Sequence, residues 1–237
     1  MRQGGKINAQ ILKMLAEKAV QGVSAKQLAD IAAAELKRLG GEAAFLNYQG
    51  FPDVLCVSVN EAVVHGIPGA YKFRAGDVVG LDFGVRYRGL ITDAAITVVV
   101  DGPASAEVER LVTVTKEALD RGVGAARAGT RVGDISQAIE AHLRADKLGV
   151  IESLVGHGVG THVHEPPEIP NFGPAGRGPK LKAGMTIAIE PMATLGGKEV
   201  YLEKDGWTVK TSDGSIAAHF EHTVLVTESG AEVLTQV

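Results

Sequence analysis

Two stretches of this chain, 108 positions apart, decide the fold: FRAGDVVGLD at residues 73–82 and LKAGMTIAIE at residues 181–190. They align without a gap and share an Ala-Gly pair. Each apolar run ends in a carboxylate, Asp82 in the first and Glu190 in the second. Valine and isoleucine are frequent in both runs, and such β-branched residues favour strands. The pair therefore predicts two equivalent strands in a repeated unit, each of which carries an acid at the same aligned position.

The segments upstream repeat at a nearly equal interval. Residues 22–36 lie over residues 129–143, an offset of 107, mainly at the apolar positions. Ser24, with Gln27 three residues later, has the pattern of a capping box and predicts a helix over about 25–39.

Helices are also expected around these segments. Asn8 is expected to cap a helix that precedes the one after Ser24. In the second half, one long helix is expected after Ser105 and another after Gly129.

The repeat predicts an α+β fold with two halves related by a pseudo-twofold axis. Each half has two helices followed by antiparallel strands, over about 8–100 and about 105–230, and both belong to a single domain spanning 1–237. Chance similarity between amphipathic elements is the alternative. A unit present only twice argues against a solenoid, which needs three or more repeats.

Composition excludes several functional classes. The 237 residues carry a formal net charge of -4, which gives no general attraction to nucleic acid or to anionic membranes. One cysteine, Cys56, excludes an intrachain disulfide framework and a Cys-rich metal site. The sequence begins without the apolar core of a signal peptide and contains no membrane-length apolar run. A cytoplasmic protein is expected.

Acids stand inside apolar strands in the first half. The run VVGLDFGVRYRGLITDAAITVVV is expected to form a hairpin that turns near Tyr87-Arg88, which would place Asp82 directly opposite Asp93. Like charges directly opposite each other destabilise a sheet, so this pair needs a reason. Protonation of one acid, or hydrogen bonds to both, is one explanation.

The second half supplies two more acids. Glu190 closes the run MTIAIE and Glu221 opens the run EHTVLV, and two strands are expected around the Asp213-Gly214 turn. If the two halves meet, four carboxylates converge. Two unit charges about 4 Å apart at an effective dielectric of about 20 repel by about 4 kcal/mol, so several such pairs would exceed the roughly 5 to 15 kcal/mol stability of a domain.

Bound cations would neutralise these acids. His157 in VGHGVG is the expected nitrogen ligand, because the flanking glycines allow a close approach of backbone and metal. Four acids with one imidazole suit Mn, Fe(II) or Co. Two such ions bridged by carboxylates generate hydroxide at neutral pH and polarise a carbonyl, which predicts a dinuclear hydrolase. His65 and His164 stand beside Gly or Pro turns and are either proton donors and carbonyl ligands or structural turn residues.

Motifs over about 45–230 of this chain resemble methionine aminopeptidases of type I, in the M24 "pita-bread" metallopeptidase family. They are VSVNEAVVHGIP, VGLDFG with GLITDAA, GHGVGTHVHEPP, IAIEPM, GWTVKT and FEHTVLVT, in the order that the family has them. The resemblance implies the pita-bread fold. It also implies removal of N-terminal methionine from peptides and nascent proteins with a small second residue, by attack of a metal-bridging hydroxide.

The same resemblance implies roles for individual residues. Asp82 would chelate one of two divalent ions (Co, Mn or Fe(II)), Asp93 and Glu221 would bridge both, and His157 and Glu190 would complete the other. Glu190 would also shuttle a proton. His164 would steady the scissile carbonyl and His65 would lie beside the leaving group. A methionine pocket is implied with the following walls: Phe45, Tyr48, Phe51, Cys56 and Trp207.

The chain departs from the family pattern in the loop before His164. Val163 stands where bacterial relatives often carry an aromatic residue, which predicts a more open pocket wall, and His162 adds a further histidine. The sequence lacks the N-terminal extension through which eukaryotic relatives associate with ribosomes. The expected partners are peptide or nascent-chain substrates, met as a monomer, with ribosome association left open.

Two other functions compete with this one. A proline-specific or creatinase-like peptidase shares the fold, but its catalytic domain usually follows a large N-terminal domain that 237 residues have no room for. A non-catalytic peptide-binding module is expected to have lost ligands, whereas all five candidates are present here.

Overall fold

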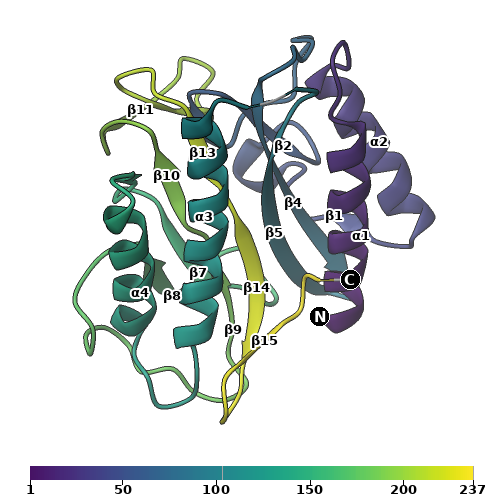
Figure 1. Cartoon of the computed structure of the whole chain (residues 1–237). Coiled ribbons are helices and arrows are strands. Elements are labelled where there is room, and N and C mark those ends of the chain that lie inside the picture. Colours follow the sequence, from purple (N-terminus) through teal and green to yellow (C-terminus); the bar gives the residue numbers. More distant parts are fainter. Residues whose placement is uncertain (103, 237) are drawn as a thin grey trace.

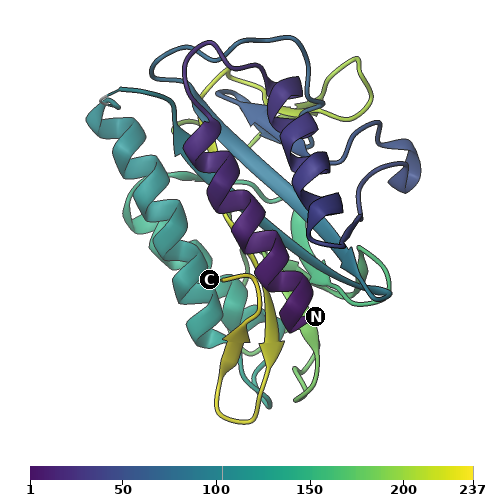
Figure 2. The ribbon, with the colours of Figure 1, turned by 90° about the vertical axis from the view of Figure 1, so that its right-hand side faces the viewer.

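The computed structural model describes residues 1–102 and 104–236. Its main element is an antiparallel sheet with helices packed on it. Helices α1 (Arg2–Lys18) and α2 (Ala25–Arg38) belong to the first half of the chain, and α3 (Ala106–Ala125) and α4 (Val132–Ala145) to the second (Figure 1). In Figure 2, the purple helices α1 and α2 lie in front of the long blue strands of the first half and run in much the same direction. The two halves thus repeat the same arrangement of a helical pair on strands.

Within the described residues, the main sheet has nine strands. Its path is β1 (Glu42–Ala43), β4 (Val78–Tyr87), β5 (Leu90–Val99), β14 (Glu221–Val226), β9 (Thr186–Ile189), β7 (Val155–Gly158) and β8 (Glu165–Pro170), with β2 (Cys56–Val59) also on β4 and β15 (Ala231–Val233) also on β14. The halves join where β5 pairs with β14, through Ala95 opposite Glu221 and Ala94 opposite His222. This central junction brings acids from both halves together.

Two small sheets lie beside the main one. The first contains β13 (Ala217–His219), β10 (Met192–Thr194) and β6 (Gly149–Val150), and the second contains β11 (Val200–Leu202), β12 (Val209–Thr211) and β3 (Ala62–Val64). The second sheet joins strands from both halves, since β3 pairs with β12.

Backbone hydrogen bonds repeat between the halves. The N–H of Gly22 donates to Phe73 O (2.9 Å), and the N–H of Gly129 donates to Leu181 O (3.0 Å). Further along, the N–H of Gly76 donates to Val100 O (2.8 Å), and the N–H of Gly184 donates to Val226 O (2.9 Å). All four glycines have a positive φ between 87° and 93°, a conformation open to glycine and strained for other residues. The aligned stretches therefore occupy equivalent places in the two halves.

Each half has its own apolar core. The first is formed where α1 and α2 pack on β4, with Leu15, Leu28 and Phe83 fully buried. The second lies under α3 and α4 and includes Ile139 and Ile187. Burial of these side chains stabilises each half by roughly 1.5 to 3 kcal/mol per large residue. The two cores support the sheet that carries the polar site.

The helix starts confirm part of the sequence analysis. The Ser24 side chain accepts from the Gln27 N–H, and the Gln27 side chain accepts from the Ser24 N–H, so the capping box is present. Ser105 caps α3 by accepting from the N–H of Val108. Asn8 does not cap a helix, because α1 begins six residues earlier, at Arg2. Asn8 is buried in mid-helix, where its amide donates to the carbonyls of Phe83 (2.5 Å) and Thr92 (3.3 Å).

The predicted register of the first hairpin was wrong by one position. The β4–β5 turn is Arg88-Gly89, both at positive φ (50° and 80°), so Asp82 lies opposite Ala95 and Asp93 opposite Gly84. The two aspartates are therefore diagonal neighbours on one face of the sheet, not direct partners.

The strands around Asp213-Gly214 do not form a hairpin with each other. Strand β12 pairs with β11 and β3, whereas β13 pairs with β10. The Asp213 carboxylate accepts from the N–H of Gly197 (2.7 Å), so this turn closes on the loop after β10 instead.

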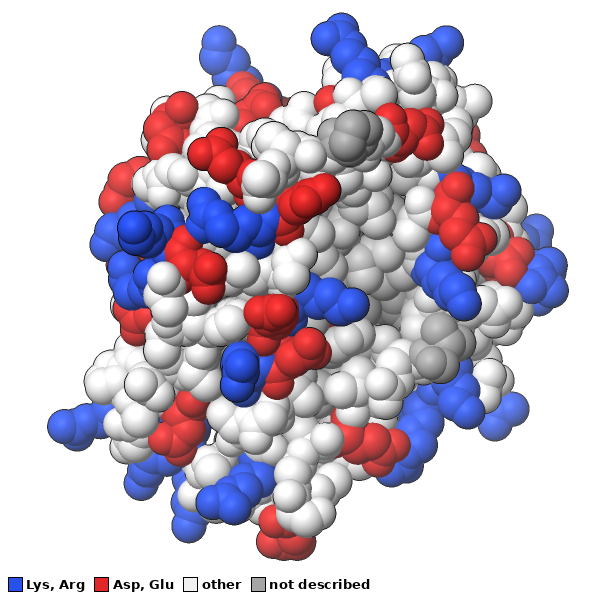
Figure 3. Space-filling model, in the orientation of Figure 1, with Lys and Arg blue, Asp and Glu red and all other residues white. Residues whose placement is uncertain are grey.

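The surface carries charges of both signs. Figure 3 shows Lys and Arg interspersed with Asp and Glu over the face seen in Figure 1, in keeping with the net charge of -4. Among the described residues, no helix is long and apolar enough to cross a membrane.

Candidate active site

One cavity of about 150 Å³ collects every residue that the sequence analysis assigned to a site. It is lined by Phe45, Tyr48, Gln49, Phe51, Cys56, His65, Asp82, Asp93, His157, Val163, His164, Glu190, Trp207 and Glu221. Acids and imidazoles occupy one part of this lining and aromatic side chains another. Residues separated by up to 176 positions in the sequence thus share one space.

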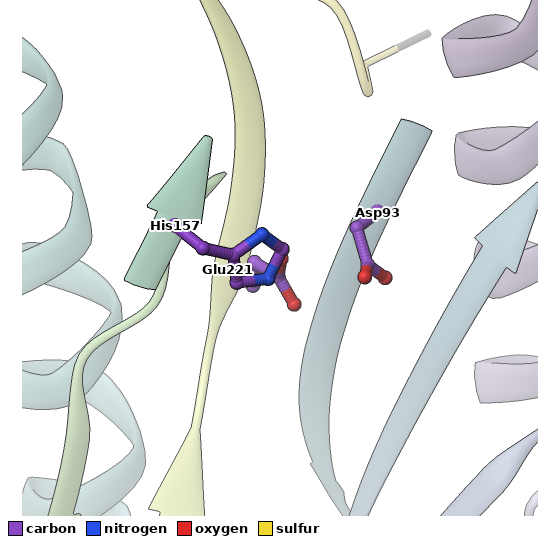
Figure 4. Close-up of side chains that lie close together, drawn as sticks. All are labelled: Asp93, His157 and Glu221. Carbon is purple, nitrogen blue, oxygen red and sulfur yellow. The ribbon is translucent and has the colours of Figure 1, made fainter. Parts of the chain in front are cut away.

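Strands from both halves hold the polar side chains. Asp82 and Asp93 come from β4 and β5, and Glu221 opens β14 next to them. Figure 4 shows the Glu221 carboxylate between the His157 ring and the Asp93 carboxylate. A donor atom from each of these three residues lies within 4.8 Å of the others. Glu190 follows β9, and its carboxylate oxygen lies 3.5 Å from His157 Nε2.

Glycines let the strand of His157 approach its neighbours. A Cβ at Gly156 would collide with the carbonyl oxygen of Ala188 on β9, and a Cβ at Gly158 would collide with that of Pro166. The His157 Nδ1 lies 2.9 Å from Gly158 O. A proton on Nδ1 donates to this carbonyl and leaves the lone pair of Nε2 facing the acids, which is the tautomer that a metal needs.

Burial and mutual repulsion oppose ionisation of the acids. Burial, with the nearby charge of Glu190, raises the pKa of Asp93 to about 7. Burial also raises the pKa of Glu190 to about 7. Burial and then the charge of Asp93 raise the pKa of Asp82 and of Glu221 well above their usual range. Ionisation of all four carboxyl groups would cost free energy, so the cluster favours the binding of protons or of cations.

The unpartnered atoms of the cluster fit a cation. Within the described residues, Asp82 Oδ1, Asp93 Oδ1 and Glu221 Oε1 are buried without a hydrogen-bond partner. Buried carboxylate oxygens normally have donors, and a metal ion would satisfy all three. The oxygen-rich set with imidazole suits borderline divalent ions.

His219 is a functional candidate that the sequence analysis did not single out. It is 3% exposed, and its Nε2 lies 3.6 Å from a Glu190 oxygen and 4.0 Å from a Glu221 oxygen. The available signal was the two-residue period of a strand, because His219 precedes Glu221 by two positions in AHFEHT.

Two further histidines border the cavity. The Tyr48 hydroxyl lies 2.9 Å from His164 Nδ1, and the His164 ring stacks edgewise 4.3 Å from the His157 ring. His65 has a positive φ of 58° at the end of β3, which turns its ring toward Trp207 at 6.4 Å. Burial lowers the pKa of His65 to about 4, and partial burial also lowers the pKa of the more exposed His164, which favours the neutral form of both rings.

The aromatic part of the cavity comes from a tight loop and from Trp207. The loop around η1 (Tyr48–Gly50) has Asn47 and Gln49 at positive φ, which packs Phe45, Tyr48 and Phe51 on one side. Phe51 and Trp207 meet edge to face at 5.3 Å. Cys56, opposite Asp82 in the sheet, completes this wall, and burial raises the pKa of its thiol.

The loop before His164 also contributes. Val163 is 1% exposed and lines the cavity, as a small apolar side chain in the wall. His162 is exposed and contacts Thr161 and Glu165, outside the cavity lining.

Buried acids and an imidazole line a cavity at the junction of two repeated halves. This arrangement is typical of a metal-dependent hydrolase site. The family of metallopeptidases M24 matches residues 1–228, and the chain belongs to this family.

Relatives of similar length point to one branch of the family. The methionine aminopeptidase of Clostridium perfringens is 44% identical over 237 residues, which is 100% of this chain and 95% of that protein. The crystal structure of the methionine aminopeptidase of Thermotoga maritima superposes with a TM-score of 0.98 at 43% identity, and covers 100% of this chain and 95% of that one. The pita-bread fold expected from the sequence is therefore confirmed.

A prolidase has the same fold at a greater distance. The prolidase from Pyrococcus furiosus has a TM-score of 0.80 at 24% identity, and this chain covers 63% of its length. This likeness concerns the fold alone.

Proposed function

We propose that this chain removes the N-terminal methionine from peptides and nascent proteins whose second residue is small. One observation carries the proposal: the cavity joins a cluster of acid and imidazole side chains to a wall of aromatic side chains and a buried thiol. Aromatic walls suit a polarizable thioether such as the methionine side chain. A methionyl group held there would lie with its carbonyl near the acids.

The acids and one imidazole would hold two divalent ions. Asp82, Asp93 and Glu221 would share the first, and the second would be held by His157 and Glu190 together with the bridging acids. When bound, such ions polarise a peptide carbonyl and provide hydroxide at neutral pH. Mn, Fe(II) and Co all accept this donor set.

Glu190 is the proposed proton carrier. Burial raises its pKa to about 7 in the metal-free chain, and a group that serves as general acid and base at neutral pH needs a pKa near this value. Its backbone carbonyl accepts from the Asn171 amide at 3.0 Å, which fixes the position of the residue after β9.

The neutral histidines would act on the substrate. If the Tyr48 hydroxyl donates to Nδ1, His164 carries its proton on Nε2 and can donate to the carbonyl oxygen where negative charge develops. His65, kept neutral by burial, would accept a hydrogen bond from the amide nitrogen of the scissile bond or donate one to the leaving amine. These roles rest on the placement of both rings in the cavity lining.

The proposal extends to the setting of the enzyme. Residues 1–237 would form one catalytic domain that acts as a monomer in the cytoplasm on chains emerging from the ribosome. A proline-specific peptidase is the second candidate, because the fold is shared with prolidase.

A peptide assay with defined metals tests the function. Metal-stripped protein is incubated with Met-Ala-Ser, Pro-Ala-Ser and Ala-Pro-Ser, with Mn, Fe(II), Co or Zn added in turn, and the released amino acids are measured. Metal-dependent release of methionine alone supports the proposal. Release from the proline peptides alone would favour the second candidate, and no release from folded protein would reject both.

Two variants sharpen this assay. Asp93→Ala removes a proposed bridging ligand and should abolish release without unfolding the chain. Glu228→Ala changes an exposed acid on the turn before β15 and should leave release unchanged. Equal activity of Asp93→Ala and the unchanged protein would contradict the proposed site.

A further inference from the structure

The internal symmetry relates Asp93 to His219. Val100 and Val226 occupy equivalent places, since each accepts from a turn glycine of its own half. Counting back three residues along each strand leads to Thr97 and Thr223, and counting back seven leads to Asp93 and His219. The junction register agrees, because Ala95 and Glu221, which lie opposite each other, are also an equivalent pair by this count.

Reciprocal hydrogen bonds hold these two residues in the same way. The N–H of Asp93 donates to Thr223 Oγ1 (2.8 Å), and this hydroxyl donates to Asp93 O (2.8 Å). The N–H of His219 donates to Thr97 Oγ1 (2.9 Å), and this hydroxyl donates to His219 O (2.7 Å). Each half therefore clamps one residue of the other half with a threonine, so that its side chain faces the acid cluster.

The His219 ring lacks the hydrogen bond that a buried imidazole normally has. Among the described residues, its Nε2 is buried without a partner, as are the three carboxylate oxygens of Asp82, Asp93 and Glu221. The ring nitrogen faces Glu190 at 3.6 Å and Glu221 at 4.0 Å, both longer than a hydrogen bond.

These separations match those between two ligands of one ion. Imidazole nitrogen and carboxylate oxygen bind zinc-like ions at roughly 2.0 to 2.2 Å, so two such donors on one ion stand roughly 3 to 4.2 Å apart. Donor atoms of Glu190, His219 and Glu221 all lie within 4.8 Å of one another.

We propose that His219 is a further metal ligand, which binds through Nε2 the ion that Glu190 and Glu221 also hold. This inference rests on the proposed metal centre and deepens it. A second imidazole shifts the donor set from oxygen toward nitrogen, which favours Fe(II), Co and Zn over Mn. His219 thus gives this centre a preference that five ligands with a single imidazole would lack.

A crystal structure of the whole chain loaded with Co(II) tests the geometry directly. Anomalous scattering locates each ion, and a distance of about 2.1 Å between His219 Nε2 and an ion confirms the inference. An ion held by His157 and Asp93 with His219 Nε2 beyond about 3 Å would overturn it and leave the proposed function standing. Crystals without any bound ion at the site would overturn both.

Metal affinity supplies an independent measurement. Titration calorimetry compares Co(II) and Mn(II) binding to the unchanged protein, to His219→Gln and to His222→Gln. His222 is the matched control, because it lies on the neighbouring strand β14 but its Nδ1 contacts Thr235 Oγ1 at 2.9 Å. His219→Gln should weaken Co(II) binding by about tenfold or more and Mn(II) binding less, whereas His222→Gln should change neither. Equal losses for the two metals would contradict the nitrogen preference.

Discussion

The hydroxyl of Tyr48 lies 2.9 Å from Nδ1 of His164, and the two residues come from segments 116 positions apart. The contact joins the aromatic part of the cavity lining to its polar part. It also decides which nitrogen of His164 faces the cavity with a proton, because a phenol that donates to Nδ1 leaves the proton on Nε2.

Tyr48→Phe should therefore slow the reaction more than it weakens substrate binding. Loss of one neutral hydrogen bond is worth about 0.5 to 1.5 kcal/mol, so kcat should fall by about three- to tenfold while KM changes little. Steady-state kinetics with a methionyl peptide measures both. Tyr201→Phe, at an exposed position, is the control. A rise in KM with unchanged kcat would show that Tyr48 serves only as a wall of the pocket.

The acid cluster should make the metal-free protein less stable as the pH rises from 5 to 8, whereas the lowered pKa values of His65 and His219 act in the opposite direction. The pKa of Asp93 is about 7 in the fold and near 4 in the unfolded chain, and that of Glu190 is also raised to about 7. An acid with a raised pKa keeps its proton longer in the fold. Its contribution is complete below the unfolded value and is lost as the pH rises through about 7, on the order of 4 kcal/mol for Asp93 alone.

Denaturant unfolding at a series of pH values measures this loss. Saturating Mn(II) should remove most of it, because a cation replaces the protons and favours the ionised acids. A metal-free protein whose stability rises between pH 5 and pH 8, with or without Mn(II), would show that the buried histidines outweigh the acids and that the acids are less crowded than described.

Fluorescence should report directly on the occupied pocket. Trp207 is the single tryptophan of the chain and lines the cavity against Phe51. L-Methionine should therefore change the emission of Trp207 in a saturable way, whereas glycine, which lacks a side chain to fill the pocket, should not. Competitive inhibition by methionine without any change in emission would place the pocket away from Trp207.

Gly84→Ala should displace an aromatic side chain of the pocket wall. A Cβ at Gly84 would stand 2.5 Å from Phe45 Cε1 and 2.9 Å from Ala44 Cβ, so the Phe45 ring must move. Overpacking of this kind destabilises a fold by typically 1 to 3 kcal/mol, and the displaced ring should raise KM. Thermal unfolding and kinetics measure the two effects.

Gly124→Ala is the matched control for this substitution. Gly124 lies in α3 with open space where a methyl group would stand, and alanine in a helix interior is favoured over glycine by roughly 0.5 to 1 kcal/mol. This variant should be slightly more stable with unchanged KM. A more stable Gly84→Ala with normal KM would mean that Phe45 adjusts freely.

The sequence predicted the repeated architecture because its signals are local. The capping box at Ser24 and the acids that follow the two aligned apolar runs, Asp82 and Glu190, depend on neighbouring residues and on strand period. All predicted site residues also line one cavity, since the resemblance assigned them by motif. Their individual roles remain predictions, because side chains brought together are compatible with several divisions of labour.

Long-range details were less accessible. The hairpin turns at Arg88-Gly89, one position later than expected, because a non-glycine residue at positive φ leaves little trace in the sequence. Asn8 has the composition of a helix cap, yet tertiary contacts with Phe83 and Thr92 place it inside α1. The sequence analysis did not single out His219, because the position of its side chain depends on a threonine on another strand.

Two pairs of acids, one pair from each half of the chain, meet at the junction between β5 and β14. Asp82 and Asp93 come from the first half, Glu190 and Glu221 from the second, and the backbone register between the halves rests on Ala94, Ala95 and their partners. Without cations, repulsion therefore acts to part the halves along this line, and with cations the same side chains draw them together. Any opening of the junction would raise the hydrogen-exchange rates of the amides held by Thr97 and Thr223. Metal binding should therefore slow exchange at these amides.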